Sequence, residues 1–229
     1  MRRSEQVPVD TVDLCPGVRV LKHSAATANV VAFGGLRPQG GFGAPAFEFV
    51  RTLSELSYNV VFVRDLTQRW FNFGIDNFSS DMDDTATQIT AVIQRSLDPS
   101  LPLYTIGNSA GGYASIFYGE ALAAHVALAI CPQTLISMPT LQRFGDKGWP
   151  QLTKFEPTVP DLRAHVTGRA RKIHIASGWE KPADMVHAGN LAGCANVAIE
   201  PIRAKHDVAT KWQATEGGLA MRVKERFES

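Results

Sequence analysis

The stretch that decides the fold is "LPLYTIGNSAGGYASIFYGEAL", residues 101–122. Its first eight residues are mostly apolar and predict a buried strand, and the segment from Ala110 onward has helix-like spacing. Ser109 lies at the junction, between glycines two positions before and two positions after it. In a G-x-S-x-G elbow the serine occupies a sharp strand-to-helix turn that lifts its hydroxyl above the sheet edge. The spacing favours a catalytic serine over a plain tight turn or a phosphate-binding turn, and no Gly-Lys-Ser/Thr follows as a P-loop requires.

The two glycines of the elbow have a steric reason. Side chains at Gly107 and Gly111 would collide across so tight a turn. The helix that begins there also directs free N–H groups and the positive end of its dipole at the serine. We therefore expect the N–H of Ala110, directly after the nucleophile, to be one donor of an oxyanion hole.

Strand and helix patterns alternate on both sides of this stretch. Further strands are predicted at residues 29–35, 59–65, 125–131, 172–178 and 196–202, and an extra edge strand at residues 17–24. Helical patterns cover residues 45–57, 84–97, 110–124 and 184–193. The alternation predicts an α/β fold in one domain, residues 1–229, with a mostly parallel sheet and helices on both faces.

The longest break in this rhythm is the proline-rich segment 132–171. Two interpretations stay open for it. It is either a loop or small cap over a binding site, or a plain excursion that carries one or two short helices.

Composition excludes several classes of function. The net charge of +1 argues against nucleic acid and anionic membranes as partners. The longest apolar run, residues 121–131, is about half as long as a membrane span, and no secretory signal is recognised, so we expect a cytoplasmic protein. Three cysteines and six histidines have no metal-ligand spacing, so neither a metal nor another cofactor is predicted. The oligomeric state is not predicted.

A serine hydroxyl needs a base to accept its proton, and a third group to orient that base. His206 follows the last predicted strand and precedes a final helix, so its loop would lie over the same sheet edge as Ser109. His125 and His174 fall in or beside strands, which favours a packing role. His206 is therefore the predicted base, and the alternative is a surface histidine near a helix.

With these residues assembled, the chain resembles the α/β-hydrolase superfamily from about residue 29 to its C-terminus. More narrowly, "GNSAGGYASIFYGEAL" and "ALAICPQT" look like segments of compact bacterial hydrolases associated with polysaccharide or cell-surface biosynthesis. "FVRDLTQRWFNFGID" and "KHDVATKWQATEGGL" look like segments of the same group. The resemblance implies an α/β-hydrolase fold with a minimal cap. Phe33 departs from the superfamily pattern, since a histidine usually precedes the oxyanion glycine.

The resemblance also implies the remaining site residues. It makes Gly35 the second oxyanion donor, with Leu36 as the fallback. It places the acid of a Ser-His-acid triad after the strand at 172–178, where Asp184 and Glu180 compete. Asp184 is favoured because an aspartate three residues before a His-Ala pair matches the narrower group, although an aspartate that opens a helix is often only its cap.

These residues predict a serine hydrolase that cleaves a carboxylic ester, with acetyl to butyryl groups preferred. Ser109 attacks the acyl carbonyl, His206 takes the proton, and water releases the acyl-enzyme. The expected partner is a small-molecule acyl ester or an acylated saccharide. The alternatives are an acyltransferase or thioesterase on the same triad, and a binding protein that has kept the fold without catalysis.

Overall fold

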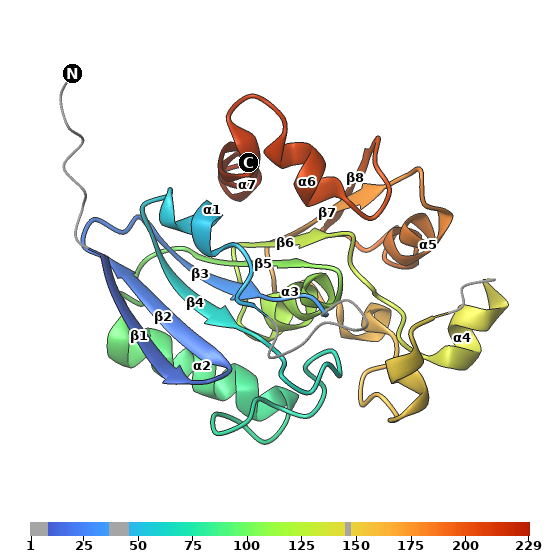
Figure 1. Ribbon diagram of the computed structural model, residues 1–229, viewed down its shortest axis with the longest axis horizontal. Coiled ribbons are helices and arrows are strands. Elements are labelled where there is room, and N and C mark those ends of the chain that lie inside the picture. The colour runs from blue at the N-terminus through green and yellow to red at the C-terminus, as the bar shows by residue number, and fades with distance from the viewer. Residues whose placement is uncertain (1–8, 37–45, 145–147) are drawn as a thin grey trace.

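The computed structural model describes residues 9–36, 46–144 and 148–229 (Figure 1). Eight strands form one sheet in the order β1-β2-β4-β3-β5-β6-β7-β8. β1 pairs antiparallel with β2, β2 pairs antiparallel with β4, and every other neighbouring pair is parallel. The strands are β1 Val9–Cys15, β2 Val18–His23, β3 Ala28–Phe33, β4 Tyr58–Val63, β5 Leu103–Asn108, β6 Val126–Ile130, β7 Lys172–Gly178 and β8 Val197–Ile202. The predicted α/β fold with a mostly parallel sheet is confirmed.

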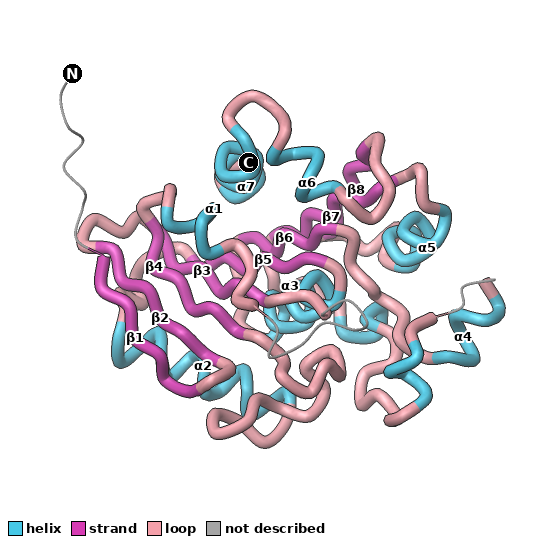
Figure 2. Tube along the Cα trace, in the orientation of Figure 1, coloured by secondary structure: helices cyan, strands magenta, loops and turns pink. Residues whose placement is uncertain are grey.

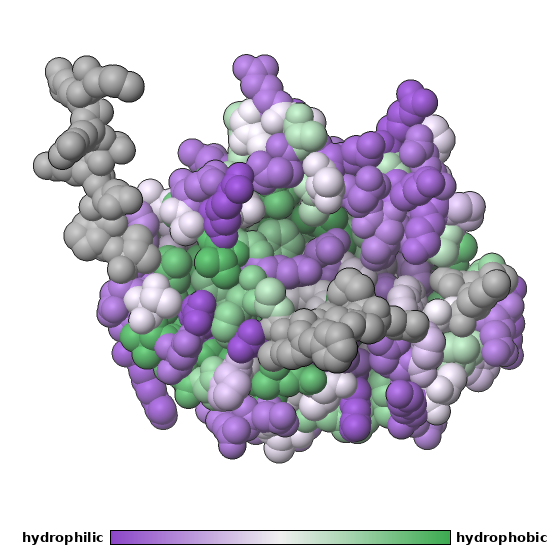
Figure 3. Space-filling model, viewed as in Figure 1, coloured by the Kyte–Doolittle hydropathy of each residue, from purple (hydrophilic) through white to green (hydrophobic). Residues whose placement is uncertain are grey.

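The edge-strand prediction was wrong in one respect. Residues 17–24 do form a strand, β2, but it lies inside the sheet between β1 and β4. The edge is β1, in which polar residues interrupt the apolar ones, so it lacks the continuous apolar run of a buried parallel strand. Val12 and Leu14 of β1 are exposed, and hydrophobic surface extends over this end of the molecule (Figure 3).

Helices cover both faces of the sheet (Figure 2). On one face lie α1 Val50–Ser54, α6 Val208–Gln213 and α7 Gly218–Phe227, and on the other lie α2 Met82–Ser96, α3 Ala110–Ala121 and α5 Pro182–Asn190 (Figure 1). Two buried apolar clusters match this division. Trp212 and Phe227 belong to one cluster, and Ile89, Tyr113 and Ala188 belong to the other.

The helix predicted at 45–57 was wrong in extent, because α1 has only five residues. Part of the predicted segment, residue 45, lies outside the described residues. Phe49, at the N-cap position of α1, has φ 63° and ψ 6°. A bulky residue rarely adopts this left-handed conformation, which prevents the helix from extending toward earlier residues.

In its described residues, segment 132–171 carries three short helical pieces, α4 Met138–Arg143, η1 Pro150–Thr153 and η2 Leu162–His165. Leu141, Leu152 and Leu162 from these pieces are buried in the cluster beneath α2, α3 and α5. The segment is thus anchored to the body of the fold by apolar packing. In the described part of the chain, no helix is both long and apolar enough to cross a membrane.

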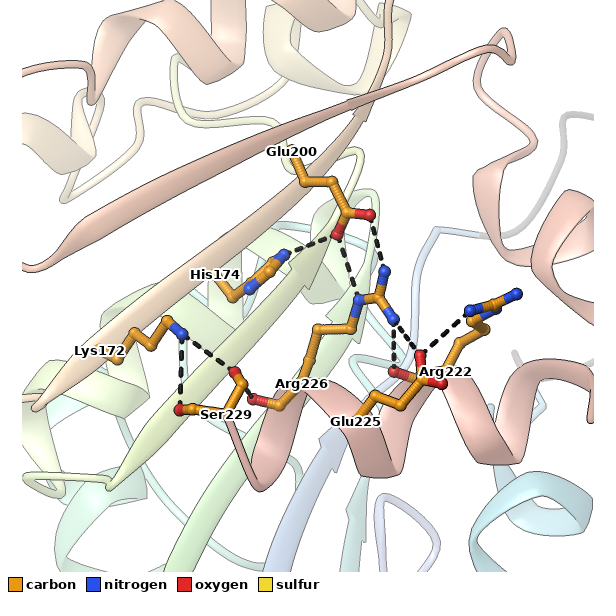
Figure 4. Close-up of polar contacts among 7 residues, drawn as sticks. All are labelled: Lys172, His174, Glu200, Arg222, Glu225, Arg226 and Ser229. Atoms are coloured by element: carbon orange, nitrogen blue, oxygen red, sulfur yellow. Dashed lines mark hydrogen bonds and ion pairs between the residues drawn. The ribbon is translucent and has the colours of Figure 1, made fainter.

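A polar network joins the C-terminal helix to two strands (Figure 4). Arg226 on α7 donates to both carboxylate oxygens of Glu200 on β8, at 2.7 and 3.2 Å. His174 Nε2 on β7 lies 2.8 Å from the same carboxylate. Burial alone would raise the pKa of Glu200, but the hydrogen bonds from Arg226 and His174 outweigh it and lower the pKa. The network therefore stabilises the folded state while Glu200 is ionised.

Candidate active site

Ser109 lies on the turn between β5 and α3, with φ 58° and ψ −117°. A non-glycine residue adopts such a conformation only where the surrounding structure holds it. The glycines explain how the turn is possible. A Cβ atom on Gly107 would overlap the Gly111 carbonyl oxygen, and a Cβ atom on Gly111 would overlap the Phe33 carbonyl oxygen. The elbow thus requires glycine at both positions.

The structure brings Ser109, His206 and Asp184 together at one edge of the sheet. His206 follows β8, and its Nε2 lies 3.0 Å from Ser109 Oγ. Its Nδ1 lies 3.0 Å from each carboxylate oxygen of Asp184. Asp184 belongs to the first turn of α5 and its side chain is only 3% exposed, whereas that of His206 is 30% exposed.

The hydrogen bonds of His206 fix its useful tautomer. A carboxylate only accepts hydrogen bonds, so the imidazole nitrogen that faces Asp184, Nδ1, carries the proton. Nε2 of the neutral ring is then an acceptor, and the Ser109 hydroxyl donates to it. The arrangement can therefore move the serine proton to the imidazole and stabilise the imidazolium that results.

The second candidate acid, Glu180, does not reach the histidine. Its carboxylate accepts a hydrogen bond from Arg203 at 3.3 Å, and the two side chains are 35% and 83% exposed. Asp207, next to the histidine in sequence, occupies the N-cap position of α6 without a side-chain cap bond. Its carboxylate accepts instead from the Lys205 N–H at 2.9 Å, which braces the loop that carries His206.

Cys131 is a neighbour of the site that the sequence did not predict. It directly follows β6, and the pairing of Asn108 with Ile130 places it beside the elbow. Its Sγ lies within 4.8 Å of ligand atoms of Asp184 and His206, a set that could in principle hold a metal ion. Burial and the charge of Asp184 raise the pKa of the Cys131 thiol to about 12. The thiol beside the triad is therefore neutral near pH 7.

The predicted oxyanion residues lie beside the serine. Ala110 is the first residue of α3, whose first backbone bond runs from the Tyr113 N–H to the Ser109 carbonyl oxygen. Its N–H therefore belongs to the first turn of the helix, where backbone N–H groups have no partner within the helix. Gly35 is adjacent, because a Cβ atom on it would lie 3.7 Å from Ser109 Cβ. The Glu48 carboxylate, which the sequence did not single out, is also close, because a Cβ atom on Gly35 would lie 3.4 Å from Glu48 Oε1, and the Gly35 N–H lowers the pKa of Glu48.

Phe33, at the position where the resemblance implies a histidine, belongs to the core. Its ring stacks on that of Tyr118 at a centroid distance of 4.9 Å and meets that of Phe71 edge-on at 5.5 Å. It is fully buried. Phe33 therefore packs the sheet against α3, and its side chain contributes no polar group to the site.

Two of the quoted segments outside the elbow, "FVRDLTQRWFNFGID" and "ALAICPQT", contact each other beside it. Trp70 Nε1 donates to Gln133 Oε1 at 2.6 Å, and the Gln133 N–H donates to the Ser109 carbonyl oxygen at 3.4 Å. The Asp65 carboxylate accepts four backbone N–H groups of the loop that carries Trp70. These residues act as a scaffold for the elbow.

Solved structures of known proteins are similar to this chain in fold, although comparisons of its sequence find no match. No protein-family model matches the chain, and no curated protein matches its sequence. Solved structures do match. The capsule O-acetyltransferase of Neisseria meningitidis serogroup A is 14% identical with a TM-score of 0.68, and the match covers 100% of this chain and 97% of that one. A bacterial heroin esterase is 15% identical with a TM-score of 0.63, covering 98% and 83% of the two chains.

The chain has the α/β-hydrolase fold. A fungal esterase structure from Rhizomucor miehei agrees, with 14% identity, a TM-score of 0.61, and coverage of 98% of this chain and 86% of that one. In the α/β-hydrolase order, nucleophile, acid and histidine follow one another along the chain. Ser109, Asp184 and His206 have this order after β5, β7 and β8.

Proposed function

We propose that this protein is a serine hydrolase that cleaves carboxylic esters of short acyl groups. One observation carries the proposal. An unbroken line of hydrogen bonds runs from Ser109 Oγ through His206 to the buried Asp184, each at 3.0 Å, and starts at an elbow with strained backbone angles. A surface serine and histidine that met by chance would have neither the strained turn nor the buried acid.

In the proposed first step, Ser109 Oγ attacks the acyl carbonyl carbon while its proton passes to His206 Nε2. The carbonyl oxygen becomes an oxyanion, which the N–H groups of Ala110 and Gly35 stabilise. The tetrahedral intermediate then collapses. His206 gives its proton to the leaving alcohol, and an acyl group stays on Ser109.

In the second step, His206 removes a proton from water, and the resulting hydroxide attacks the acyl-enzyme. The same two N–H groups stabilise the second oxyanion. Collapse releases the carboxylic acid and returns the proton to Ser109. Asp184 keeps the imidazole in place through both steps and stays ionised.

A second candidate is acyl transfer to a saccharide hydroxyl. The observation that favours it is the similarity over nearly the full length of both chains to the meningococcal capsule O-acetyltransferase. The chemistry of the first step would be the same, and an acceptor hydroxyl would replace water in the second.

A panel of p-nitrophenyl esters from acetyl to dodecanoyl, with and without a saccharide acceptor, tests the proposal. We expect turnover that is highest for acetyl to butyryl and is lost in Ser109→Ala. Ser54→Ala, which removes an exposed hydroxyl that donates to the Arg51 carbonyl oxygen, is the matched control and should keep full activity. Acylated saccharide in place of free acid would favour the second candidate. A rate that increases steadily to dodecanoyl would contradict the preference for short chains.

A further inference from the structure

A carboxyl group outside the proposed triad lies beside the oxyanion loop. Glu48 belongs to the turn before α1, and its carboxylate is close enough to the Gly35 N–H for this group to lower the pKa of Glu48. A Cβ atom on Gly35 would lie 3.4 Å from Glu48 Oε1 and 3.7 Å from Ser109 Cβ. The carboxylate and the serine are thus both close to the same small region, the one in which the oxyanion would form.

The neighbours of Glu48 fix the backbone from which it reaches Gly35. Phe49, directly after it, has φ 63°, a conformation that persists only where other contacts hold it. Phe47, directly before it, packs its ring against that of Phe62 at a centroid distance of 6.3 Å. The backbone position of Glu48 is therefore set by the conformation and the packing of its two neighbours in sequence.

The second carboxylate oxygen of Glu48 is shielded from solvent. Oε2 is buried and has no hydrogen-bond partner among the residues that the structure describes. An ionised carboxylate with an unsatisfied buried oxygen is costly, whereas the neutral acid is not. Burial accordingly raises the pKa of Glu48 to about 7, although the Gly35 N–H lowers it.

Two arginines lie beside this turn, one on β2 and one directly after β4, and each also bonds to another residue. The guanidinium groups of Arg19 on β2 and Arg64 after β4 lie over the Phe47 ring, 4.9 and 4.2 Å from its centroid. Arg19 also pairs with Asp13 on β1, and Arg64 Nε donates to the Pro16 carbonyl oxygen at 2.7 Å. Neither arginine contributes to the shift of Glu48, which burial and the Gly35 N–H produce.

Near the serine, His206 and Asp184 bond to each other, and Lys181 Nζ lies 3.8 Å from Asp184 Oδ1. On the basis of the proposed function, we propose that Glu48 is a positioning residue that controls access to the oxyanion hole. Its ionised carboxylate occupies the Gly35 N–H and repels a developing oxyanion, whereas the neutral acid is a weak acceptor that an oxyanion displaces. The site is then competent only while Glu48 holds a proton.

The proposal fixes the shape of the pH profile. His206 must be neutral to accept the serine proton, which gives a rising limb, and Glu48 must be protonated, which gives a falling limb above about pH 7. Loss of one oxyanion donor lowers a rate by about 10²-fold or more. We therefore expect the rate to fall by about 100-fold along the second limb.

The experiment measures the rate at which a fluorophosphonate labels Ser109 from about pH 5 to 10. The wild type should have both limbs. Glu48→Gln, a permanently neutral group of the same shape, should keep the rising limb and lose the falling one. Glu55→Gln is the matched control, because this carboxylate lies just after α1 and pairs with Arg51 at the surface. It should behave like the wild type.

Two outcomes separate the proposals. Labelling with the same falling limb in wild type and Glu48→Gln would overturn the role of Glu48 and leave the proposed function standing. No labelling in any variant would overturn both. Should Glu48→Gln fail to fold, by circular dichroism, the amide ¹⁵N shift of Gly35 in the wild type decides. It should titrate with a midpoint near pH 7, and a shift that stays constant would contradict the proposal.

Discussion

Replacement of Asp184 by asparagine tests how the site holds its base. Both carboxylate oxygens lie 3.0 Å from His206 Nδ1, and the side chain is 3% exposed, so burial leaves an amide little freedom to move away. An amide N–H that faces Nδ1 requires that nitrogen to accept, which moves the imidazole proton to Nε2. Nε2 then cannot take the proton of Ser109. We expect kcat to fall by about 10⁴-fold, on the order of 5 kcal/mol in the barrier.

The assay compares Asp184→Asn with Glu180→Gln, using p-nitrophenyl acetate turnover and thermal melting followed by circular dichroism. The second variant removes only an exposed ion pair with Arg203, which contributes under about 1 kcal/mol, so its kcat should stay within about two-fold of wild type. The reasoning is refuted if Glu180→Gln is inactive while Asp184→Asn keeps more than about a tenth of wild-type turnover.

Three further predictions concern stability. Gly111→Ala should destabilise the fold by about 3 kcal/mol or prevent folding, since its Cβ would overlap a backbone oxygen; a melting temperature equal to that of wild type would contradict this. Arg226→Gln should lower the free energy of unfolding, measured with urea at pH 7, by about 2 kcal/mol, because it removes two hydrogen bonds to the Glu200 carboxylate. Arg222→Gln, whose partner Glu225 is exposed, should lower the same free energy by under about 1 kcal/mol. Equal losses of stability in Arg222→Gln and Arg226→Gln would argue against a stabilising role of the Glu200 network. For Glu48, the folded state binds more protons than the unfolded state between pH 4.5 and about 7, so the free energy of unfolding should decrease as pH rises through this window. Relative to Glu48→Gln, the decrease should reach about 3 kcal/mol, and parallel pH profiles of the two proteins would contradict the assigned ionisation.

The elbow could be predicted from sequence because its constraint is local. Two glycines that flank a serine, between an apolar run and a helical pattern, leave few other conformations. One of the close approaches, between Gly107 and Gly111, joins residues only four apart, whereas the approach of Gly111 to Phe33 depends on the packing of the elbow against β3. The position of His206 followed from topology, since loops after parallel strands share one edge of the sheet. Sequence alone left Asp184 and Glu180 open. In the structure Asp184 is buried beside His206, whereas Glu180 pairs with Arg203, and this difference depends on the packing of α5.

Glu48 and Cys131 could not be predicted for a different reason. Glu48 lies in a segment whose apolar spacing is typical of a helix, yet the left-handed Phe49 ends that pattern and tertiary contacts set the chain path. Cys131 ends an apolar run in which a cysteine resembles any small buried residue. Both acquire their chemical surroundings from contacts with residues distant in sequence, Gly35 for the one and Asp184 for the other.

The most direct test of the central claim is a peptide map of the protein after treatment with a fluorophosphonate. An activated serine reacts with this reagent and an ordinary one does not. We expect one phosphonyl group, located on Ser109, and a loss of labelling in His206→Gln. An unlabelled protein, or a label on another residue that persists in Ser109→Ala, would contradict it.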